Sequence, residues 1–348
     1  MTTLQQPDVN AGDVSHAALS RCRALVEPAL RAAVDRLPQR MRQVAGYHLG
    51  WLDERGAPIS GDRGKAIRPA LVLLSARAAG GDPATAVPAA VAVELVHNFS
   101  LLHDDVMDGD VTRRHRPTAW TVFGSSTAIL AGDALLSLAS DVLAASQHRE
   151  ATTAIRTLSS AVLGLIEGQT DDIDFEERGD VGPDECQRMA RNKTGALLGC
   201  ACALGALYGG GNPEQVTRLR GFGEHLGLAF QHVDDLLGIW GDPAATGKPV
   251  FSDLRTRKKS LPVVAALTSA TSEGRELAEL YQRDRSLNDA ELARAAELIT
   301  GAGGQAWSRH QANGLLATAL NDLRRADPDP DAADDLVALA HLMTKRDR

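Results

Sequence analysis

Residues 97–114 contain the feature that most limits how this chain can fold, because four aspartates fall within seven positions directly behind an apolar run. Asp104 and Asp108 are four positions apart, so on a helix their carboxylates share one face, with Asp105 alongside. Like charges at this spacing repel one another unless they are hydrated or share a cation. Carboxylate oxygens favour magnesium over zinc as that cation. The alternative is a solvated acidic helix end.

The composition favours helices throughout the chain. The 348 residues are 44% hydrophobic, which is enough for a large core, and Ala and Leu are abundant. No stretch shows the sustained alternation that strands need. We therefore expect an all-α protein, built as a single-domain bundle of long helices around a deep central cavity. This domain is predicted over residues 15–348, behind a disordered lead-in at residues 1–14.

Charge, cysteine spacing and the N-terminus exclude several other classes. A net charge of −8 argues against nucleic acid as a partner. The cysteines show no CxxC spacing and are expected to be reduced thiols, and the N-terminus lacks signal-peptide features, so a cytoplasmic protein is predicted. The uncharged stretch 194–213 is apolar only to about Tyr208, too short for a membrane span, and is predicted to be a buried helix.

Several cations are not explained by local stability. Lys65 and Arg68 stand at the beginning of a predicted helix, where positive charge opposes the macrodipole, and this favours anion binding. Arg113, Arg114 and Arg116 follow the aspartates. They form either salt bridges or the fork-shaped donors that phosphate oxygens prefer.

A second aspartate pair, Asp234 and Asp235, lies near the end of a predicted helix at 214–240 and precedes a Gly- and Pro-rich loop with Lys248 and Lys258. Each acidic cluster thus stands at the polar end of an apolar helix and before a basic loop. On facing helices of a bundle, the two clusters would hold several magnesium ions and, with the basic loops, diphosphate. The apolar helices would line a pocket for a hydrocarbon tail.

Seven ordered motifs make the chain resemble the trans-isoprenyl diphosphate synthases, also called the polyprenyl synthetase family. They are GKxxRP at 64–69, ELVHxxSLLHDDxxD at 94–108, the arginine pair at 113–114, GQxxD at 168–172, KTG at 193–195, FQxxDD at 230–235 and GKP at 247–249. The resemblance implies an isoprenoid synthase fold, a homodimer without a membrane span, and magnesium-dependent condensation of isopentenyl diphosphate with an allylic diphosphate. Ionisation of the allylic substrate, attack by the double bond and loss of a proton would follow in that order.

The resemblance also assigns roles to single residues. Asp104 and Asp108 would bridge metal ions with Asp105 in support, and Asp234 would hold a further ion, giving three per active site. Gln169 and Asp172 would complete that side. The residues expected to contact the allylic diphosphate are Arg113, Lys193, Lys248 and Lys258. Those expected to bind the diphosphate of isopentenyl diphosphate are Lys65, Arg68, His97 and Arg114. Thr194 and Gln231 would present oxygens toward the developing carbocation.

One position departs from the family pattern. The second motif reads Asp-Asp-Leu-Leu-Gly, so Gly238 stands where a third aspartate is usual. Water or Asp242 would then replace the carboxylate. A non-catalytic subunit of a two-chain synthase is the alternative, but the first motif, Asp234 and Lys258 are intact, so we expect activity.

Product length is predicted from the helix before the first motif. Phe99 lies five positions before Asp104, where a ring would act as a floor for the growing chain, while Ser100 and Val96 are smaller. By resemblance this pattern implies a C20 product, geranylgeranyl diphosphate. The alternatives are a C15 product, a product of C25 or longer, and a Phe99 that merely packs between helices. A class I terpene cyclase is a further alternative, but its Asn/Ser/Glu metal motif is not seen here and it needs no Lys65, Arg68 and His97 pocket.

Overall fold

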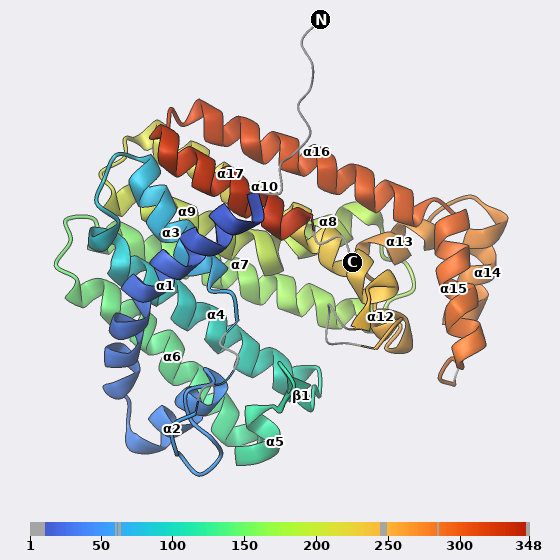
Figure 1. Ribbon diagram of the computed structural model, residues 1–348. Helices are drawn as coiled ribbons and strands as arrows, with labels where there is room; N and C mark the ends of the chain where they lie inside the picture. Colours follow the sequence, from blue (N-terminus) through green and yellow to red (C-terminus); the bar gives the residue numbers. More distant parts are fainter. Residues whose placement is uncertain (1–10, 60, 62–63, 244–248, 284, 346–348) are drawn as a thin grey trace, which may run out of the picture. The chain divides into compact units, whose positions relative to one another are not determined.

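The computed structural model describes residues 11–59, 61, 64–243, 249–283 and 285–345 (Figure 1). Apart from one short hairpin and one isolated bridge, the regular structure in these residues is helical, which confirms the predicted all-α class. The chain forms two compact units. Unit 1 comprises residues 1–160, 200–220 and 323–342, and unit 2 comprises residues 161–199, 221–322 and 343–348. Each is described separately.

Unit 1 is built on helices rich in Ala, Leu and Val. Its elements are α1 (Ala11–Asp35), α2 (Gln39–His48), α3 (Ile67–Ala78), η1 (Pro83–Ala86), α4 (Val87–Met107), β1 (Thr112–Arg113), β2 (Arg116–Pro117), α5 (Ala119–Phe123), α6 (Ser125–Ala145) and most of α17 (Pro330–Thr344). Helix α4 packs along α6 and against α3. Leu95 and Leu102 of α4, Leu71 of α3 and Leu135 of α6 are fully buried, so α4 is a central helix of this unit.

Unit 2 contains the remaining helices, and α7, α9, α10 and α16 have residues in both units. The elements are α7 (Ala151–Glu177), α8 (Pro183–Ala190), η2 (Arg191–Gly195), α9 (Ala196–Tyr208), α10 (Pro213–Trp240), α12 (Ser252–Arg255), α13 (Leu261–Leu267), α14 (Ser272–Tyr281), α15 (Asp289–Gly301) and α16 (Gly304–Arg325). Ile239 near the end of α10 and Leu254 of α12 belong to one buried cluster, so the short α12 is anchored in the core.

The predicted start of the folded part was wrong. Helix α1 begins at Ala11, so residues 11–14 are helical rather than lead-in, and residues 1–10 lie outside the described residues. Once Ala18 and Leu19 are packed, extending the helix backwards needs no new nucleus. Helix α7 continues to Glu177, and its last turns bury the ring of Phe175 in a hydrophobic cluster.

The prediction of a buried helix in the uncharged stretch is confirmed. This stretch forms α9, whose residues from Leu197 to Ala206 are largely buried. The four cysteines, expected to be reduced, are free and also buried; they are Cys22, Cys186, Cys200 and Cys202.

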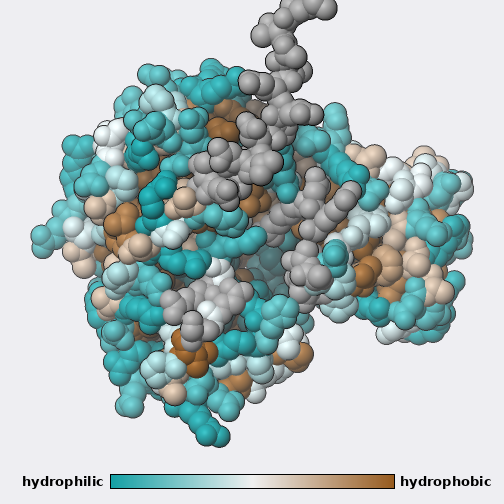
Figure 2. Space-filling view, viewed as in Figure 1, coloured by the Kyte–Doolittle hydropathy of each residue, from teal (hydrophilic) through white to brown (hydrophobic). Residues whose placement is uncertain are grey.

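Two segments are long and apolar enough to cross a membrane by length and composition alone, Pro83–Met107 and Ser125–Ala145. Buried helices of water-soluble proteins pass the same test, and 67% of the first segment's apolar window is buried against 39% of the second's. On the face shown in Figure 2, hydrophilic residues predominate and apolar ones form separate patches. The lack of a membrane span stays a prediction.

Candidate active site

The first aspartate motif closes α4. Asp108 is the C-cap of the helix, and its backbone N–H donates to the Asp104 carbonyl at 2.8 Å, so the two residues stand one turn apart, as the spacing predicted. Asp104 is half-buried and Asp108 is exposed. Asp105 is 1% exposed, and its Oδ1 accepts a hydrogen bond from Arg113 Nε and forms an ion pair with Arg113 Nη2, both at 2.7 Å. The carboxylates of Asp104 and Asp108 are therefore accessible, whereas that of Asp105 is buried and bound to Arg113.

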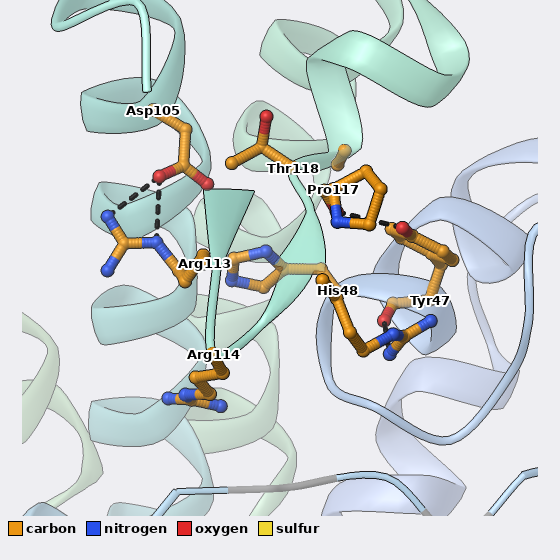
Figure 3. A pocket seen from close by; sticks show the side chains of 9 residues that line it. Tyr47, His48, Asp105, Arg113, Arg114, Pro117 and Thr118 are labelled. Atoms are coloured by element: carbon orange, nitrogen blue, oxygen red, sulfur yellow. Dashed lines mark hydrogen bonds and ion pairs between the residues drawn. The ribbon is translucent and has the colours of Figure 1, made fainter. Parts of the chain in front are cut away.

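A two-stranded hairpin positions the arginines after this motif (Figure 3). Strands β1 and β2 pair antiparallel, and the two residues between them, Arg114 and His115, adopt φ of 50° and 60°. Such a turn normally takes Gly or Asn, so two ordinary side chains here are strained. Arg116 donates to the carbonyls of Tyr47 and Leu52 at 3.1 Å. Of the three arginines, Arg116 is thus structural, a distinction that the sequence left open.

A second group of cations lies where α3 begins. Ala66, the N-cap of α3, is left-handed at φ 51°, and Arg68 follows in the first turn. Arg68 Nη1 lies 3.1 Å from Nε2 of His97; since arginine only donates, the imidazole accepts and is neutral. Consistently, burial and the nearby arginines hold the pKa of His97 well below its usual value.

Arg114 approaches the same group. The Cβ of any residue larger than glycine at Gly64 would lie 2.8 Å from Arg114 Nη2, so the Arg114 guanidinium lies against this position, and the φ of 69° at Gly64 favours glycine there. Burial, reinforced by Arg114, lowers the pKa of Arg68 to about 10, although the Glu94 carboxylate opposes this. The structure therefore brings together Arg68, His97 and Arg114, with Lys65 next to Gly64 in the chain.

His48 is a residue that the sequence analysis did not single out. It lines a cavity of about 20 Å³, room for one water molecule, together with Arg113 and Arg114 (Figure 3). In the described part of the chain, its buried Nε2 has no hydrogen-bond partner. Burial, with Arg113 and Arg114 acting in the same direction, lowers the pKa of His48 to about 3. A lone histidine on α2, far from any motif, carries no sequence signal for this position.

The low pKa of His48 predicts acid destabilisation. The pKa of His48 is 6.5 in the unfolded chain and about 3 in the folded one. Between these two pH values the unfolded state therefore binds a proton at His48 and the folded state does not. The stabilisation present above pH 6.5 is therefore lost as the pH falls. Between pH 7.5 and 5 we expect a loss of about 1–2 kcal/mol from His48. Urea unfolding at several pH values should give a shallower pH slope for His48→Gln than for the wild type, and parallel slopes would contradict this account.

The second aspartate motif lies on α10 in unit 2. Asp234 is exposed, whereas Asp235 is 4% exposed. The Asp235 carboxylate accepts from Gln231 Nε2 at 2.8 Å and from the backbone N–H of Leu261 at 2.9 Å. Burial raises the pKa of Asp235 to about 7, although these donors and Lys258 oppose the shift. As in the first motif, one aspartate is accessible and its neighbour is held by the fold.

Thr194 and Gln231 are in direct contact. Thr194 lies in η2, a π-helical turn of a kind often found at functional sites, and its Oγ1 donates to Gln231 Oε1 at 2.7 Å. Because Gln231 also donates to Asp235, its amide orientation is fixed.

Lysines balance part of the acidic charge in unit 2. Lys193 Nζ donates to Asp172 Oδ2 at 2.5 Å. Burial would lower the pKa of Lys258, but four carboxylates outweigh it and raise that pKa; they are Asp172, Asp235, Asp253 and Asp234. Gln169, one turn before Asp172, is 6% exposed, and its side-chain atoms have no hydrogen-bond partner within the described ranges. Lys248, the remaining predicted ligand, lies outside them.

The residues predicted to set product length are buried in α4. Phe99 is 6% exposed, and its ring packs edge-on against His103 with centroids 4.8 Å apart. Gly132 of α6 faces this pair, where a Cβ would lie 3.4 Å from Phe99 Cδ2. Val96 is fully buried, and the Ser100 hydroxyl donates to the His97 carbonyl at 2.9 Å.

The accessible carboxylates of the two aspartate motifs suit a metal ion that binds together with the substrate. Among the described residues, no three His, Cys, Asp or Glu side chains converge so as to hold an ion by themselves. Magnesium, however, usually binds through one or two carboxylates together with waters and substrate phosphates. Accessible carboxylates at Asp104, Asp108 and Asp234, with no sulfur ligand among them, fit that mode.

Comparisons with known proteins agree with this geometry. Residues 50–299 match the model of a protein family described as Polyprenyl synthetase. A (2E,6E)-farnesyl diphosphate synthase of Mycobacterium bovis is 49% identical over 92% of this chain and 90% of that protein. A geranylgeranyl diphosphate synthase of Mycobacterium tuberculosis is 46% identical over 96% and 95%. The crystal structure of a polyprenyl synthetase from Streptomyces coelicolor superposes with a TM-score of 0.91 at 51% identity, covering 94% of this chain and 98% of that one. The expected isoprenoid synthase fold is thereby confirmed.

Proposed function

This chain belongs to the polyprenyl synthetase family and is a trans-prenyl diphosphate synthase, and we propose that it condenses isopentenyl diphosphate with allylic diphosphates to a C20 product. One observation carries the proposal of condensation: Arg68 and Arg114 gather around the neutral His97, and this group of nitrogen donors is built from residues outside the two aspartate motifs. A reaction on a single diphosphate needs no second anion site. Two substrates with one diphosphate each do need one, which favours condensation over the cyclisation catalysed by a class I terpene cyclase.

In the proposed reaction, Asp104, Asp108 and Asp234 would hold magnesium, three ions in our proposal, and this metal would neutralise the diphosphate that leaves the allylic substrate. Arg113 and Lys193 would add positive charge near the departing oxygens. Arg68 and Arg114 would hold isopentenyl diphosphate so that its double bond attacks the allylic carbocation. The oxygens of Thr194 and Gln231 would face that carbocation. A proton is then lost to the departing diphosphate.

Turnover by the purified chain tests the proposal directly. Magnesium, labelled isopentenyl diphosphate and C5, C10 or C15 primers are supplied, and the products are separated by chromatography. Label in a linear prenyl diphosphate is the expected result. No incorporation with any primer would favour the alternative of a non-catalytic subunit of a two-chain synthase, and a cyclic hydrocarbon made without isopentenyl diphosphate would favour a cyclase.

Phe99 supports the C20 assignment, while the 49% identical relative bears the name of a C15 synthase. We predict that Phe99→Ala lengthens the main product by at least one C5 unit, because removing the ring deepens the space beside His103. Reversed-phase chromatography of the dephosphorylated alcohols measures this. Phe123→Ala is the matched control, because the Phe123 ring packs against Tyr47 of α2 and neither residue belongs to α4. An unchanged distribution in Phe99→Ala would remove Phe99 from the argument.

We also propose a homodimer. Two apolar residues of α6, Ile129 and Leu130, are 40% and 57% exposed. On α7, three more are at least 42% exposed; they are Leu163, Ile166 and Ile173. Exposed apolar groups of this size on long helices are typical of faces that helix packing covers. The mass measured by light scattering tests the proposal.

A further inference from the structure

Arg23 of α1 contacts the segment with which the GKxxRP motif begins. Its Nη2 donates a hydrogen bond to the backbone carbonyl oxygen of Gly64, 41 positions later in the chain. Arg23 is half-buried, and α1 packs against both α3 and α4. It belongs to none of the seven motifs and lies before residue 50, where the match to the family begins. The motifs therefore do not account for this contact.

The segment that Arg23 contacts has an unusual backbone. Gly64 at φ 69° and Ala66 at φ 51° are both left-handed, and only Lys65 stands between them. For alanine this conformation costs free energy and persists only where the surroundings enforce it; such residues cluster at functional sites. Ala66 directly precedes α3, which carries Arg68 in its first turn. The path of the chain from Gly64 to Arg68 therefore depends on contacts with other segments.

Two arginines from distant segments contact Gly64. Arg23 of α1 binds its carbonyl oxygen, and the guanidinium of Arg114, in the turn between β1 and β2, lies against its α-carbon, where a Cβ would be 2.8 Å from Nη2. The two contacts differ in what they leave for a ligand. Arg23 binds the backbone of the segment, so any effect of Arg23 on a ligand passes through that segment.

Arg23 also acts on the buried carboxylate beside Arg68. Burial raises the pKa of Glu94, and among the charges that oppose this shift Arg68 comes first, followed by Arg114 and Arg23. Arg23, Ala66 and Glu94 line one small cavity of about 40 Å³. Arg23 is thus close both to the left-handed segment and to the carboxylate that attracts Arg68.

We propose that Arg23 is a positioning residue for the diphosphate of isopentenyl diphosphate: by binding the Gly64 carbonyl, it fixes the segment that presents Lys65 and leads into Arg68. The identity of this diphosphate rests on the proposed function. Binding of isopentenyl diphosphate should then depend on a residue of α1 that acts only through the backbone. Binding of the allylic diphosphate, which we assign to the aspartate motifs, should not depend on it.

Steady-state kinetics of Arg23→Met test the proposal, because methionine keeps an unbranched apolar chain and removes the donor. The KM for isopentenyl diphosphate should rise about 10-fold, the effect of losing one hydrogen bond from a charged donor. The KM for the allylic diphosphate and kcat should stay within about twofold of the wild type. A merely structural role would reduce the folded fraction and so lower kcat, with both KM values unchanged. That result, or an equal rise of both KM values, would overturn the proposal.

Arg31→Met is the matched control on the same helix. Arg31 pairs with Glu27 at 2.9 Å and lies over the ring of Trp51, so its removal also costs an ion pair and packing. It should leave the KM for isopentenyl diphosphate within about twofold of the wild type. Arg23→Lys keeps the charge and one donor, and its KM should lie between those of the wild type and Arg23→Met. A rise in Arg31→Met as large as that in Arg23→Met would contradict a specific role for Arg23.

Direct binding separates this inference from the proposed function. Calorimetry with isopentenyl diphosphate alone needs no primer and no turnover, and the Kd should be about 10-fold weaker in Arg23→Met than in the wild type. A wild type that does not bind isopentenyl diphosphate would overturn the proposed function. A wild type that binds it and turns over, with the same Kd in Arg23→Met, would remove only this inference.

A crystal structure of the wild type with isopentenyl diphosphate decides the matter if Arg23→Met does not fold. The expected result is a diphosphate in contact with Lys65 and Arg68 while Arg23 still donates to the Gly64 carbonyl. A diphosphate that contacts neither Lys65 nor Arg68, or a segment that has moved away from Arg23 in the complex, would overturn the proposal.

Discussion

Asp104→Asn is expected to lower kcat/KM of the condensation by about 10²- to 10³-fold, the loss seen when one preorganised group that stabilises a developing negative charge is removed. Asp104 is the half-buried, accessible carboxylate of the first motif, one helical turn from Asp108. Asparagine keeps an oxygen at the same place but removes the charge that binds magnesium and, through it, the leaving diphosphate. Steady-state rates at saturating magnesium measure the effect.

Neighbouring aspartates provide the controls. Asp110→Asn changes an exposed carboxylate just behind the motif and should leave kcat/KM within about twofold. Asp105→Asn should act on stability, because its carboxylate is 1% exposed and accepts a hydrogen bond from Arg113 Nε as well as an ion pair from Arg113 Nη2; weakening these contacts costs about 1–3 kcal/mol of unfolding free energy. Equal losses of activity in Asp104→Asn and Asp110→Asn would show that the motif is only a charged helix end.

Arg68→Met is expected to raise the KM for isopentenyl diphosphate by about 10- to 100-fold, which corresponds to the loss of one hydrogen bond between charged groups. It should also lower the free energy of unfolding by about 2–3 kcal/mol. Burial raises the pKa of Glu94, and Arg68 is the charge that opposes this shift most. Without Arg68, the buried Glu94 carboxylate loses its main counterion. Kinetics and urea unfolding on the same samples measure both effects.

A second substitution separates binding from stability. Arg68→Met/Glu94→Gln removes both charges, and the new amide oxygen at position 94 can still accept from Asn98, which donates to Glu94 Oε1 at 3.1 Å in the wild type. We expect the double variant to regain most of the stability but not the KM. Arg77→Met, on the same helix but paired with Asp331 and Asp335, should leave the KM unchanged. If stability and KM recover together in the double variant, Arg68 acts only through the fold.

Local patterns predicted most of the first motif. The four-residue spacing of Asp104 and Asp108 placed them on one helical face without any tertiary information, because both residues belong to the same continuous helix. The helical class followed in the same way from composition and periodicity. Helix ends depend on tertiary contacts: the last turns of α7, to Glu177, carry Phe175, which is buried by segments that lie elsewhere in the sequence.

The sequence by itself determined the all-α class, the family and the chemical types of the site: two aspartate clusters and separate cations, all carried by short motifs. Only the tertiary structure decided which arginine and which carboxylate of these groups lie where a ligand can reach them and which are bound to the rest of the protein. Arg116 is bound to backbone carbonyls whereas Arg114 lies against Gly64. Asp105 is buried whereas Asp104 is accessible. The physical reason is that these outcomes depend on contacts between segments far apart in the chain, which residue types and spacing within one segment do not specify.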